Sequence, residues 1–472
     1  MAGSSYQAAV TRMYALGHEL AAPAHKFDLS QMRALLEALN HPERRFPSLL
    51  IAGTNGKGST AATLASILRA SGLRTALYTS PHLVRINERI RINGSAIPDS
   101  DFAWLHDRVD RAALRLVAQG ELPWHPSFFE MLTAIAFEHF ANAKVDLAVL
   151  EVGMGGRLDA TNVVEPRLSV ITDVSLDHQK FLGDTVAEIA SEKAGILRRG
   201  GVVVTLPQQP QANDVIGRAI LDLDVHAADA VRYVPSIAPG SSRWLAEGAD
   251  RERGTAEGTS EQTARSQEVS IRGPVLRYPL EVMGQQILVE SPLVGRHQLR
   301  NIALAIAASE ELARQGFPVT PRAIAQGIRQ TRWPGRFQVV PPRPGTPEYV
   351  LDVAHNPAGA WALRSTLSEY CEDRPLTFVF GAMRDKAIAQ MAEILFPLAE
   401  RVIATPAENP RSATVEEIRQ AASRLATDIE SAEGVGAALD RANQLASPAG
   451  VVVITGSIYI VGEAISQLGG KV

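Results

Sequence analysis

The sequence predicts an α/β protein built from two domains. Short, near-continuously apolar segments alternate with helical segments, which is the pattern of a parallel sheet covered by helices on both faces. This alternation occurs twice, before and after a proline-rich stretch at residues 318–335. The length of 472 residues is sufficient for two or three domains.

The predicted elements divide into two sets. In the first domain the predicted strands are residues 48–52, 74–80, 145–152, 168–174 and 201–206, and the predicted helices are residues 60–68, 128–140 and 299–314. In the second domain the predicted strands are residues 349–353, 376–380, 401–404 and 450–455. Residues 235–263 lack periodicity and are predicted to form a solvated insertion. We therefore place the domains at 1–330 and 331–472.

Residues 53–59, Gly-Thr-Asn-Gly-Lys-Gly-Ser, connect the first predicted strand to the first predicted helix. Glycines allow backbone N–H groups to approach phosphate oxygens, the helix N-terminus adds positive potential, and Lys57 supplies a mobile charge. The strict Walker pattern fails, because the first glycine lies closer to the lysine and Gly58 replaces the Ser/Thr that would hold Mg²⁺. A simple glycine turn would also fit these residues, but the context favours a nucleotide site.

Polar residues follow the neighbouring strands of the first domain. Ser80, Glu151 and Asp173 stand at or near strand ends, and Asp177-His178 lies just beyond the last of these strands. The carboxyl ends of parallel strands meet at one edge of a sheet, and Mg²⁺ prefers hard oxygen ligands. Singly, each residue could be a helix cap or turn residue, and His178 alone indicates a hydrogen-bonding residue. Together they favour a Mg²⁺ site.

Further polar residues give weaker signals. Lys193 lies on the helix opened by the capping box at residues 185–188, and its spacing alone predicts a solvated lysine. His297 and Asn301 are four apart and share a helix face. Arg336 is equally consistent with a phosphate ligand and with a surface arginine. In the second domain, residues 352–357 and Gly456-Ser457 end strands and could face the nucleotide across a cleft.

Composition bounds the class of protein. The net charge of −4 provides no basic field for nucleic acid, and no apolar run approaches a membrane span. The one cysteine, Cys371, excludes an internal disulfide framework and fits a reducing compartment. Residues 1–20 lack the basic start and apolar core of a signal peptide. We expect a cytoplasmic protein with no nucleic-acid or membrane partner.

Together the motifs resemble the folylpolyglutamate synthase/dihydrofolate synthase group of the Mur ligase superfamily. The matching segments occur in the family's order at residues 53–59, 79–83, 127–130, 151–162, 177–178, 192–196, 334–336, 352–357 and 454–457. The resemblance implies an N-terminal P-loop ATPase domain with a mainly parallel sheet and a smaller, Rossmann-like α/β domain after it. The insertion at residues 235–263 is not part of the common pattern.

The resemblance also implies roles for individual residues. The ATP-contacting positions would be Asn55, Gly56, Lys57, Gly58, Ser59, Asn301, Arg336 and Asp352. Ser80, Glu151 and His178 would hold Mg²⁺, and Lys193 would be N6-carboxylated to serve a second Mg²⁺. The pterin-binding positions would be Lys26, Phe27, Asp28, Leu29, Ser127, Phe128, Phe129, Glu130, Leu158, Asp159 and Ala160. His355 and Ser457 would help to place the incoming glutamate. The residues with catalytic roles would be Lys57, Lys193 and His355.

The implied reaction forms an amide bond through an acyl phosphate and releases ADP. L-Glutamate would be joined to dihydropteroate, giving dihydrofolate, and to tetrahydrofolates, giving polyglutamates, by an enzyme expected to be a monomer. The residues do not separate dihydropteroate from reduced folates, so a single-activity folylpolyglutamate synthase stays open. Less favoured hypotheses are another amino-acid ligase of the superfamily, a P-loop ATPase or GTPase switch, and a regulatory protein on a degenerate scaffold.

Overall fold

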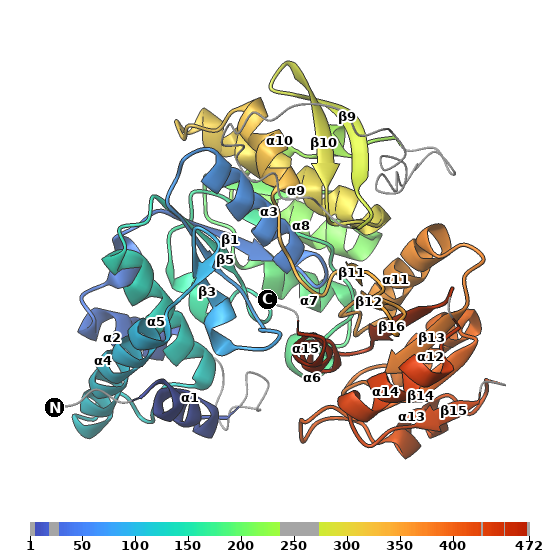
Figure 1. Ribbon diagram of the computed structural model, residues 1–472. Coiled ribbons are helices and arrows are strands. Elements are labelled where there is room, and N and C mark those ends of the chain that lie inside the picture. The colour runs from blue at the N-terminus through green and yellow to red at the C-terminus, as the bar shows by residue number, and fades with distance from the viewer. Residues whose placement is uncertain (1–4, 18–27, 237–272, 426–427, 448, 470–472) are drawn as a thin grey trace, which may run out of the picture.

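The computed structural model describes residues 5–17, 28–236, 273–425, 428–447 and 449–469. Lys26 and Phe27, two of the expected pterin-binding residues, lie outside the described residues, as do residues 237–263 of the predicted insertion. The described residues form two α/β units and one hairpin, which Figure 1 shows. No helix of this described part is long and apolar enough to cross a bilayer.

The first sheet has eight strands in the order β4-β3-β2-β5-β1-β6-β7-β8. These are β1 (Ser48–Ala52), β2 (Thr75–Tyr78), β3 (Ile90–Ile92), β4 (Ser95–Ala96), β5 (Leu147–Glu151), β6 (Ser169–Ile171), β7 (Val202–Thr205) and β8 (His226–Asp229). At one edge the β2–β3 and β3–β4 pairs are antiparallel, and the remaining pairs are parallel. The parallel pairs place the carboxyl ends of six strands along one edge of the sheet.

Helices cover both faces of this sheet. The helices of this unit are α1 (Tyr6–Ala15), α2 (Leu29–Ala38), α3 (Lys57–Ala70), α4 (Asp99–Ala118), α5 (Phe128–Asn142), α6 (Gln179–Leu182), α7 (Val186–Ala194), α8 (Pro210–Asp222), α9 (Arg296–Arg314) and α10 (Pro321–Arg329). Successive side chains of β1 alternate between two cores: Leu49 and Ile51 pack with α3 and α9, whereas Leu50 and Ala52 pack with α4 and α5. Burial on both faces explains why β1 is apolar throughout.

The second sheet has six strands in the order β11-β12-β16-β13-β14-β15. Its elements are β11 (Gln338–Val340), β12 (Glu348–Leu351), α11 (Pro357–Tyr370), β13 (Leu376–Phe380), α12 (Ile388–Leu395), β14 (Arg401–Ala404), α13 (Val415–Ala421), β15 (Ile429–Ser431), α14 (Val435–Leu445), β16 (Val451–Thr455) and α15 (Ile458–Gln467). Only β11 runs antiparallel to its neighbour among these described strands. The core on one face of the first sheet continues through Phe337 to Phe378 and Val453 of the second.

The α/β class and the mainly parallel sheet are confirmed, and every predicted strand is present with its bounds shifted by at most a few residues. Strands β3, β4, β8, β11 and β15 and the hairpin of β9 (Leu276–Val282) and β10 (Gln285–Ser291) were not predicted. These strands are short or have exposed positions, as in the alternating burial of β9 and the two exposed residues of β4. A segment that is half exposed lacks the continuous apolar run by which the central strands were recognised.

The packing of α10 on α3 requires a glycine. A Cβ atom on Gly327 would lie 2.3 Å from Cα of Ile67, and Ser66 Oγ donates a 2.7 Å hydrogen bond to the Gly327 carbonyl. We expect Gly327→Ala to lower the free energy of unfolding by about 2–3 kcal/mol, because backbone atoms of α3 cannot yield without moving the helix. Urea unfolding followed by circular dichroism measures this change.

Gly217 in α8 serves as the matched control. It is also a helical glycine, but a Cβ atom there would meet no heavy atom within 4 Å. Gly217→Ala should raise the free energy of unfolding by about 0.5–1 kcal/mol, the usual gain for this change in a helix. Equal effects of the two substitutions would contradict the assigned close contact.

Candidate functional site

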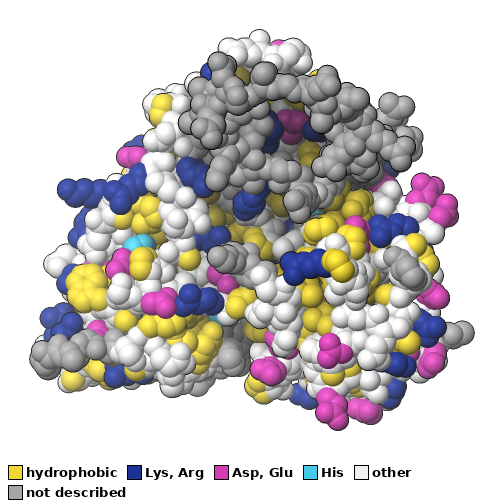
Figure 2. Space-filling view, in the orientation of Figure 1, with side chains coloured by type: hydrophobic (Ala, Val, Ile, Leu, Met, Phe, Trp, Pro, Cys, Tyr) yellow, Lys and Arg dark blue, Asp and Glu magenta, His cyan; other side chains and the backbone are white. Residues whose placement is uncertain are grey.

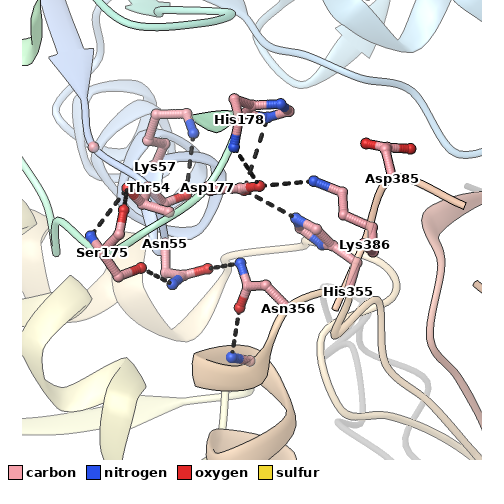
Figure 3. A network of polar contacts seen from close by, with 12 residues as sticks. Thr54, Asn55, Lys57, Ser175, Asp177, His178, His355, Asn356, Asp385 and Lys386 are labelled. Atoms are coloured by element: carbon pink, nitrogen blue, oxygen red, sulfur yellow. Dashed lines mark hydrogen bonds and ion pairs between the residues drawn. The ribbon is translucent and has the colours of Figure 1, made fainter. Parts of the chain in front are cut away.

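A cavity of about 600 Å³ lies where the carboxyl ends of the two sheets meet. Residues 53–59, Ser80 and Glu151 line it from the first sheet, and residues 352–356 and Ser457 line it from the second. Parallel strands bring these distant segments together because each sheet presents its strand ends along one edge. Figure 3 shows the centre of this region, where polar side chains of both units meet.

The loop at residues 53–59 is shaped by its glycines. Gly56 has φ +89° and caps α3, and a Cβ atom there would strike Asn301 Oδ1 at 2.2 Å. A Cβ atom on Gly58 would meet the Trp333 ring at 2.9 Å. The Trp333 ring therefore accounts for a glycine where the Walker pattern has a hydroxyl. Lys57 Nζ donates to the Thr54 carbonyl at 3.2 Å, and its charge lies on the cavity wall.

Ser80 and Glu151 stand side by side because β2 and β5 are parallel neighbours. The Ser80 N–H lies 3.4 Å from Glu151 Oε2, and only 4% of Glu151 is exposed. His178 follows β6 and lines the same cavity. Burial, with the charges of Lys386 and Lys57, lowers the pKa of His178 to about 4, against the pull of Asp177. The site thus offers a carboxylate, a hydroxyl and a neutral imidazole, a donor set that fits Mg²⁺ through its oxygens.

The prediction that Lys193 lies on a solvated face is wrong. Only 3% of Lys193 is exposed, and its Nζ donates a 2.8 Å hydrogen bond to the Gly53 carbonyl. A Cβ atom on Gly156 would lie 2.6 Å from the Glu192 carbonyl oxygen, so α7 packs closely on this glycine and turns Lys193 inward. Burial and the nearby Lys57 charge lower the pKa of Lys193 to about 7.

Helix α9 supplies the next part of the wall. Asn301 donates to Gln298 at 2.9 Å, and Gln298 lies 3.4 Å from Ser59 of the loop. His297 also lines the cavity, and burial and the Arg336 charge lower its pKa to about 4. The shared face predicted for positions 297 and 301 is thus turned to the site.

Arg336 lies on the cavity wall rather than on the outer surface. Burial lowers the pKa of Arg336, and the negative charges of Asp352 and Glu151 oppose this. Asp352 is held by N–H groups of Phe337 at 2.8 Å and Ala354 at 2.9 Å, and its burial raises its pKa. Arg336 and Asp352 thus bring the segment between α10 and β11 close to the end of β12.

The second sheet contributes His355, Asn356, Lys386 and Ser457. His355 Nδ1 lies 3.0 Å from the Val353 carbonyl, an acceptor, so Nδ1 carries the proton. Asn356 Nδ2 donates to Asn55 Oδ1 at 3.0 Å. Ser457 is buried and caps α15. His355, Asn356 and Ser457 were predicted from their place after strands. Lys386 follows β13 in the same way, but it was not predicted.

Asp177 is the meeting point of charges across the cavity. Its carboxylate accepts from Lys386 Nζ at 2.7 Å and lies 3.8 Å from His355 Nε2. Burial opposes ionisation, but the nearby His355 and His178 rings and the positive charge of Lys386 outweigh it and hold the pKa of Asp177 below its ordinary value. A first-sheet carboxylate thus faces a lysine and a histidine of the second sheet.

Of the described residues expected to bind the pterin, Phe128 lines the cavity. The others have structural contacts: Asp28 caps α2, Leu29 is buried, Ser127 and Glu130 form a capping box, Phe129 packs on Gly153, Leu158 is half-buried, Asp159 caps a short 3₁₀ helix, and Ala160 is buried. For Asp28, Ser127, Glu130 and Asp159, capping explains the spacing without a ligand.

Three residues without a predicted role, Tyr14, His82 and Arg89, lie beside Phe128. The Tyr14 ring stacks on Phe128 at 5.9 Å, and its hydroxyl lies 3.2 Å from His82 Nε2. Arg89 Nε donates to His82 Nδ1 at 2.8 Å, and its guanidinium lies 5.4 Å from the Phe128 ring centre. Burial and the Arg89 charge lower the pKa of His82 well below its usual range. Together they form an aromatic and cationic wall.

The loop at residues 53–59 faces a second α/β unit across one cavity, and this two-unit fold points to a ligase of the Mur type. In agreement, the family model described as "Mur ligase, glutamate ligase domain" matches residues 335–458. A folylpolyglutamate synthase of Lacticaseibacillus casei is 35% identical over 98% of this chain and 99% of its own length. A dihydrofolate synthase/folylpolyglutamate synthase of Mycobacterium tuberculosis is 34% identical over 93% of this chain and 90% of its own.

Solved structures agree with these relatives. The Mycobacterium tuberculosis folylpolyglutamate synthase complexed with ADP and AMPPCP superposes with a TM-score of 0.82 at 32% identity, covering 99% of this chain and 100% of that one. An Escherichia coli protein in complex with DHPP and ADP gives 0.78 at 27% identity, covering 99% and 98%. The chain belongs to the folylpolyglutamate synthase/dihydrofolate synthase family.

The burial of Lys193 predicts a pH-dependent stability. Its folded pKa of about 7 lies below the ordinary value of 10.5, so between these values the unfolded chain binds more protons. The penalty for burying the amine is full below pH 7 and fades as pH rises toward 10. Lys193→Met should therefore stabilise the protein most at pH 6.5, and its advantage should shrink by about 2 kcal/mol or more at pH 9.5.

Urea unfolding of both proteins at the two pH values, in bicarbonate-free buffer, measures this difference. Because the other titrating groups are the same in the variant and the wild type, their contributions to the free energy of unfolding cancel in the difference. A difference that stays constant between pH 6.5 and pH 9.5 would contradict the depressed pKa.

Proposed function

We propose that this chain is an ATP-dependent ligase that joins L-glutamate to dihydropteroate and to tetrahydrofolates and releases ADP and phosphate. The observation that carries the proposal is the shared cavity. The phosphate loop and the strand ends that bear His355 and Ser457 line one space, so a phosphate donor and an amine acceptor can meet there. Family membership supports the same chemistry.

Nucleotide binding is assigned to the loop and to the polar residues opposite it. These are Asn55, Gly56, Lys57, Gly58, Ser59, Asn301, Arg336 and Asp352, all on the cavity wall. The start of α3 offers N–H groups to phosphate oxygens, and Lys57 and Arg336 supply positive charge. Related structures bind ADP and AMPPCP, which supports ATP as the phosphate donor.

Ser80, Glu151 and His178 are assigned to one Mg²⁺ and a carboxylated Lys193 to a second. When bound, the two cations would neutralise charge that develops on the transferring phosphoryl group. An amine reacts with CO₂ only when neutral, and burial makes the Lys193 amine neutral in a large fraction of molecules near pH 7–8. This supports carboxylation at Lys193, which would exchange a buried cation for a carbamate oxygen donor.

The acceptor is assigned to the wall that contains Phe128. The expected set comprises Lys26, Phe27, Asp28, Leu29, Ser127, Phe128, Phe129, Glu130, Leu158, Asp159 and Ala160. The stacked Tyr14 and Phe128 rings and the adjoining Arg89 support a flat, anionic acceptor on this wall. Related structures bind DHPP with ADP, and folate with AMPPCP.

The reaction then proceeds in two displacements. The acceptor carboxylate attacks the γ-phosphorus of ATP, an acyl phosphate forms and ADP leaves, with Lys57 holding the phosphates in place. The α-amine of glutamate, placed by His355 and Ser457, attacks the acyl carbon; phosphate leaves and the amine loses a proton. The second domain covers the site, which keeps water from the acyl phosphate.

The remaining assignments concern organisation. We propose a boundary at about residue 330, with an ATP-binding domain at 1–330 and a glutamate-ligase domain at 331–472; the family match at residues 335–458 supports this division. We also propose a cytoplasmic monomer that acts on small molecules. On the described part of the face in Figure 2, Lys and Arg are interspersed with Asp and Glu, which supports the absence of a nucleic-acid partner.

The decisive experiment follows ADP release with ATP, Mg²⁺ and L-glutamate, separately with 7,8-dihydropteroate and with tetrahydrofolate. Turnover with both acceptors is the expected result, and turnover with one would leave a single-activity synthase. ATP hydrolysis that depends on neither glutamate nor a pterin would overturn the proposal in favour of an ATPase switch.

Lys57→Ala should lower product formation by about 10²-fold or more, because the phosphates lose a positioned charge. The variant should fold normally, since the lysine makes one hydrogen bond, to the Thr54 carbonyl, among the contacts of the described residues. Lys144→Asn is the control: it removes an exposed lysine, and asparagine tolerates the left-handed backbone at that position. Retained turnover in Lys57→Ala would sink the assignment.

A further inference from the structure

The phosphate loop is bonded directly to the second domain. Asn356 Nδ2 donates a 3.0 Å hydrogen bond to Asn55 Oδ1 of the loop, although the residues are 301 apart in sequence. Figure 3 shows the two amides facing each other between the loop and the start of α11. A contact between these elements can relate the position of the nucleotide phosphates to that of the second domain.

The geometry fixes which amide atom faces which. Asn356 is the N-cap of α11, and its Oδ1 accepts from the Gly359 N–H at 2.8 Å. A backbone N–H can only donate, so the oxygen of Asn356 must face the helix and its NH₂ group must face the loop. Asn55 therefore presents Oδ1 to Asn356 and donates its own NH₂ to Ser175 Oγ at 3.2 Å.

The loop side of this contact is anchored in the first sheet. Thr54 Oγ1 donates to the Ser175 carbonyl at 3.0 Å and accepts from the Ser175 N–H at 3.1 Å. The backbone N–H groups of Thr54 and Asn55 both donate to the Asp173 carbonyl. Asn356 thus docks on a loop that the end of β6 already holds in place.

On the other side, Asn356 is the chain neighbour of His355. The His355 ring is held through Nδ1 by the Val353 carbonyl, so it moves with this strand end as a unit. We infer that Asn356 is a positioning residue that docks the second domain on the phosphate loop and thereby sets the place of His355 relative to the nucleotide phosphates. This inference rests on the proposed function, in which His355 helps to place the incoming glutamate.

A second contact between the units does not replace this one. Lys386 reaches Asp177 at 2.7 Å, but through a long side chain whose four flexible bonds permit several docked positions. Asn356 has a short side chain whose far end is bonded on both sides. The Lys386–Asp177 ion pair can attract the domains to each other, whereas the Asn356–Asn55 hydrogen bond fixes their relative position.

Asn356→Ser separates the two roles of the side chain. Serine is as good an N-cap as asparagine and keeps the bond from Gly359, but it is too short to reach Asn55. The variant should unfold at the wild-type urea concentration, lower kcat/KM for glutamate about tenfold and change KM for ATP less than twofold. ADP released per glutamate incorporated should rise above one, because water captures an acyl phosphate that the amine meets less often.

Two further variants serve as controls. Asn356→Ala loses both bonds, so it should show the same kinetic change together with a lower urea midpoint. Arg441→Met removes an exposed charge on α14 that pairs with Glu430 of β15 and should leave both readouts at wild-type values. Asn356→Ser overturns the inference if kcat/KM for glutamate and the ADP ratio are unchanged, or if KM for ATP rises as much as KM for glutamate.

A measurement without turnover separates this inference from the proposed function. Hydrogen–deuterium exchange of the ligand-free protein should be faster in residues 53–59 of Asn356→Ser than of the wild type, because the loop has lost its bond to the second domain. Equal exchange would overturn the docking role. If the wild type fails to glutamylate either acceptor while the exchange difference is present, the proposed function fails and the docking role stands.

Discussion

The structure depends on one constraint: the carboxyl ends of two parallel sheets must face each other across a single cavity. Each sheet gathers its strand ends along one edge, so each contributes a row of polar groups from segments far apart in sequence. An apolar core that continues from the first sheet through Phe337 to the second holds these edges in place. The cavity is then polar at its centre and supported by packing on its flanks.

Placing charges in that cavity is unfavourable unless they are balanced. Asp177 of the first unit forms an ion pair with Lys386 of the second unit and lies near His355. Asp352 of the second unit lies near Arg336, which precedes β11. Lys193 donates instead to the neutral carbonyl of Gly53, and its pKa is about 7. A ligand with phosphate oxygens would bring negative charge to Lys57 and Arg336 on the cavity wall and so stabilise their positive charges.

The strand, turn and helix order around Gly53–Ser59 follows from local spacing, and the central strands follow from continuous apolar runs, which is why both were predicted correctly. The edge strands β4 and β8 were not, because exposed positions remove the apolar signal. Among site residues, Ser80, Glu151 and His355 were found through their place at strand ends. The prediction for Lys193 was wrong because helix spacing does not show which face of α7 packs on Gly156. Tyr14 has no local sequence pattern that indicates a role in the site.

The sequence by itself determined the class of fold, the phosphate loop and the set of strand ends on which chemistry could lie, because these depend on backbone preferences and on periodic burial within a few residues. Only the tertiary structure decided which strand ends share a cavity, that Arg336 faces inward, and that Asn356 meets Asn55. Those facts depend on the packing of one sheet against another. Contacts between residues some 300 positions apart leave no trace in local spacing.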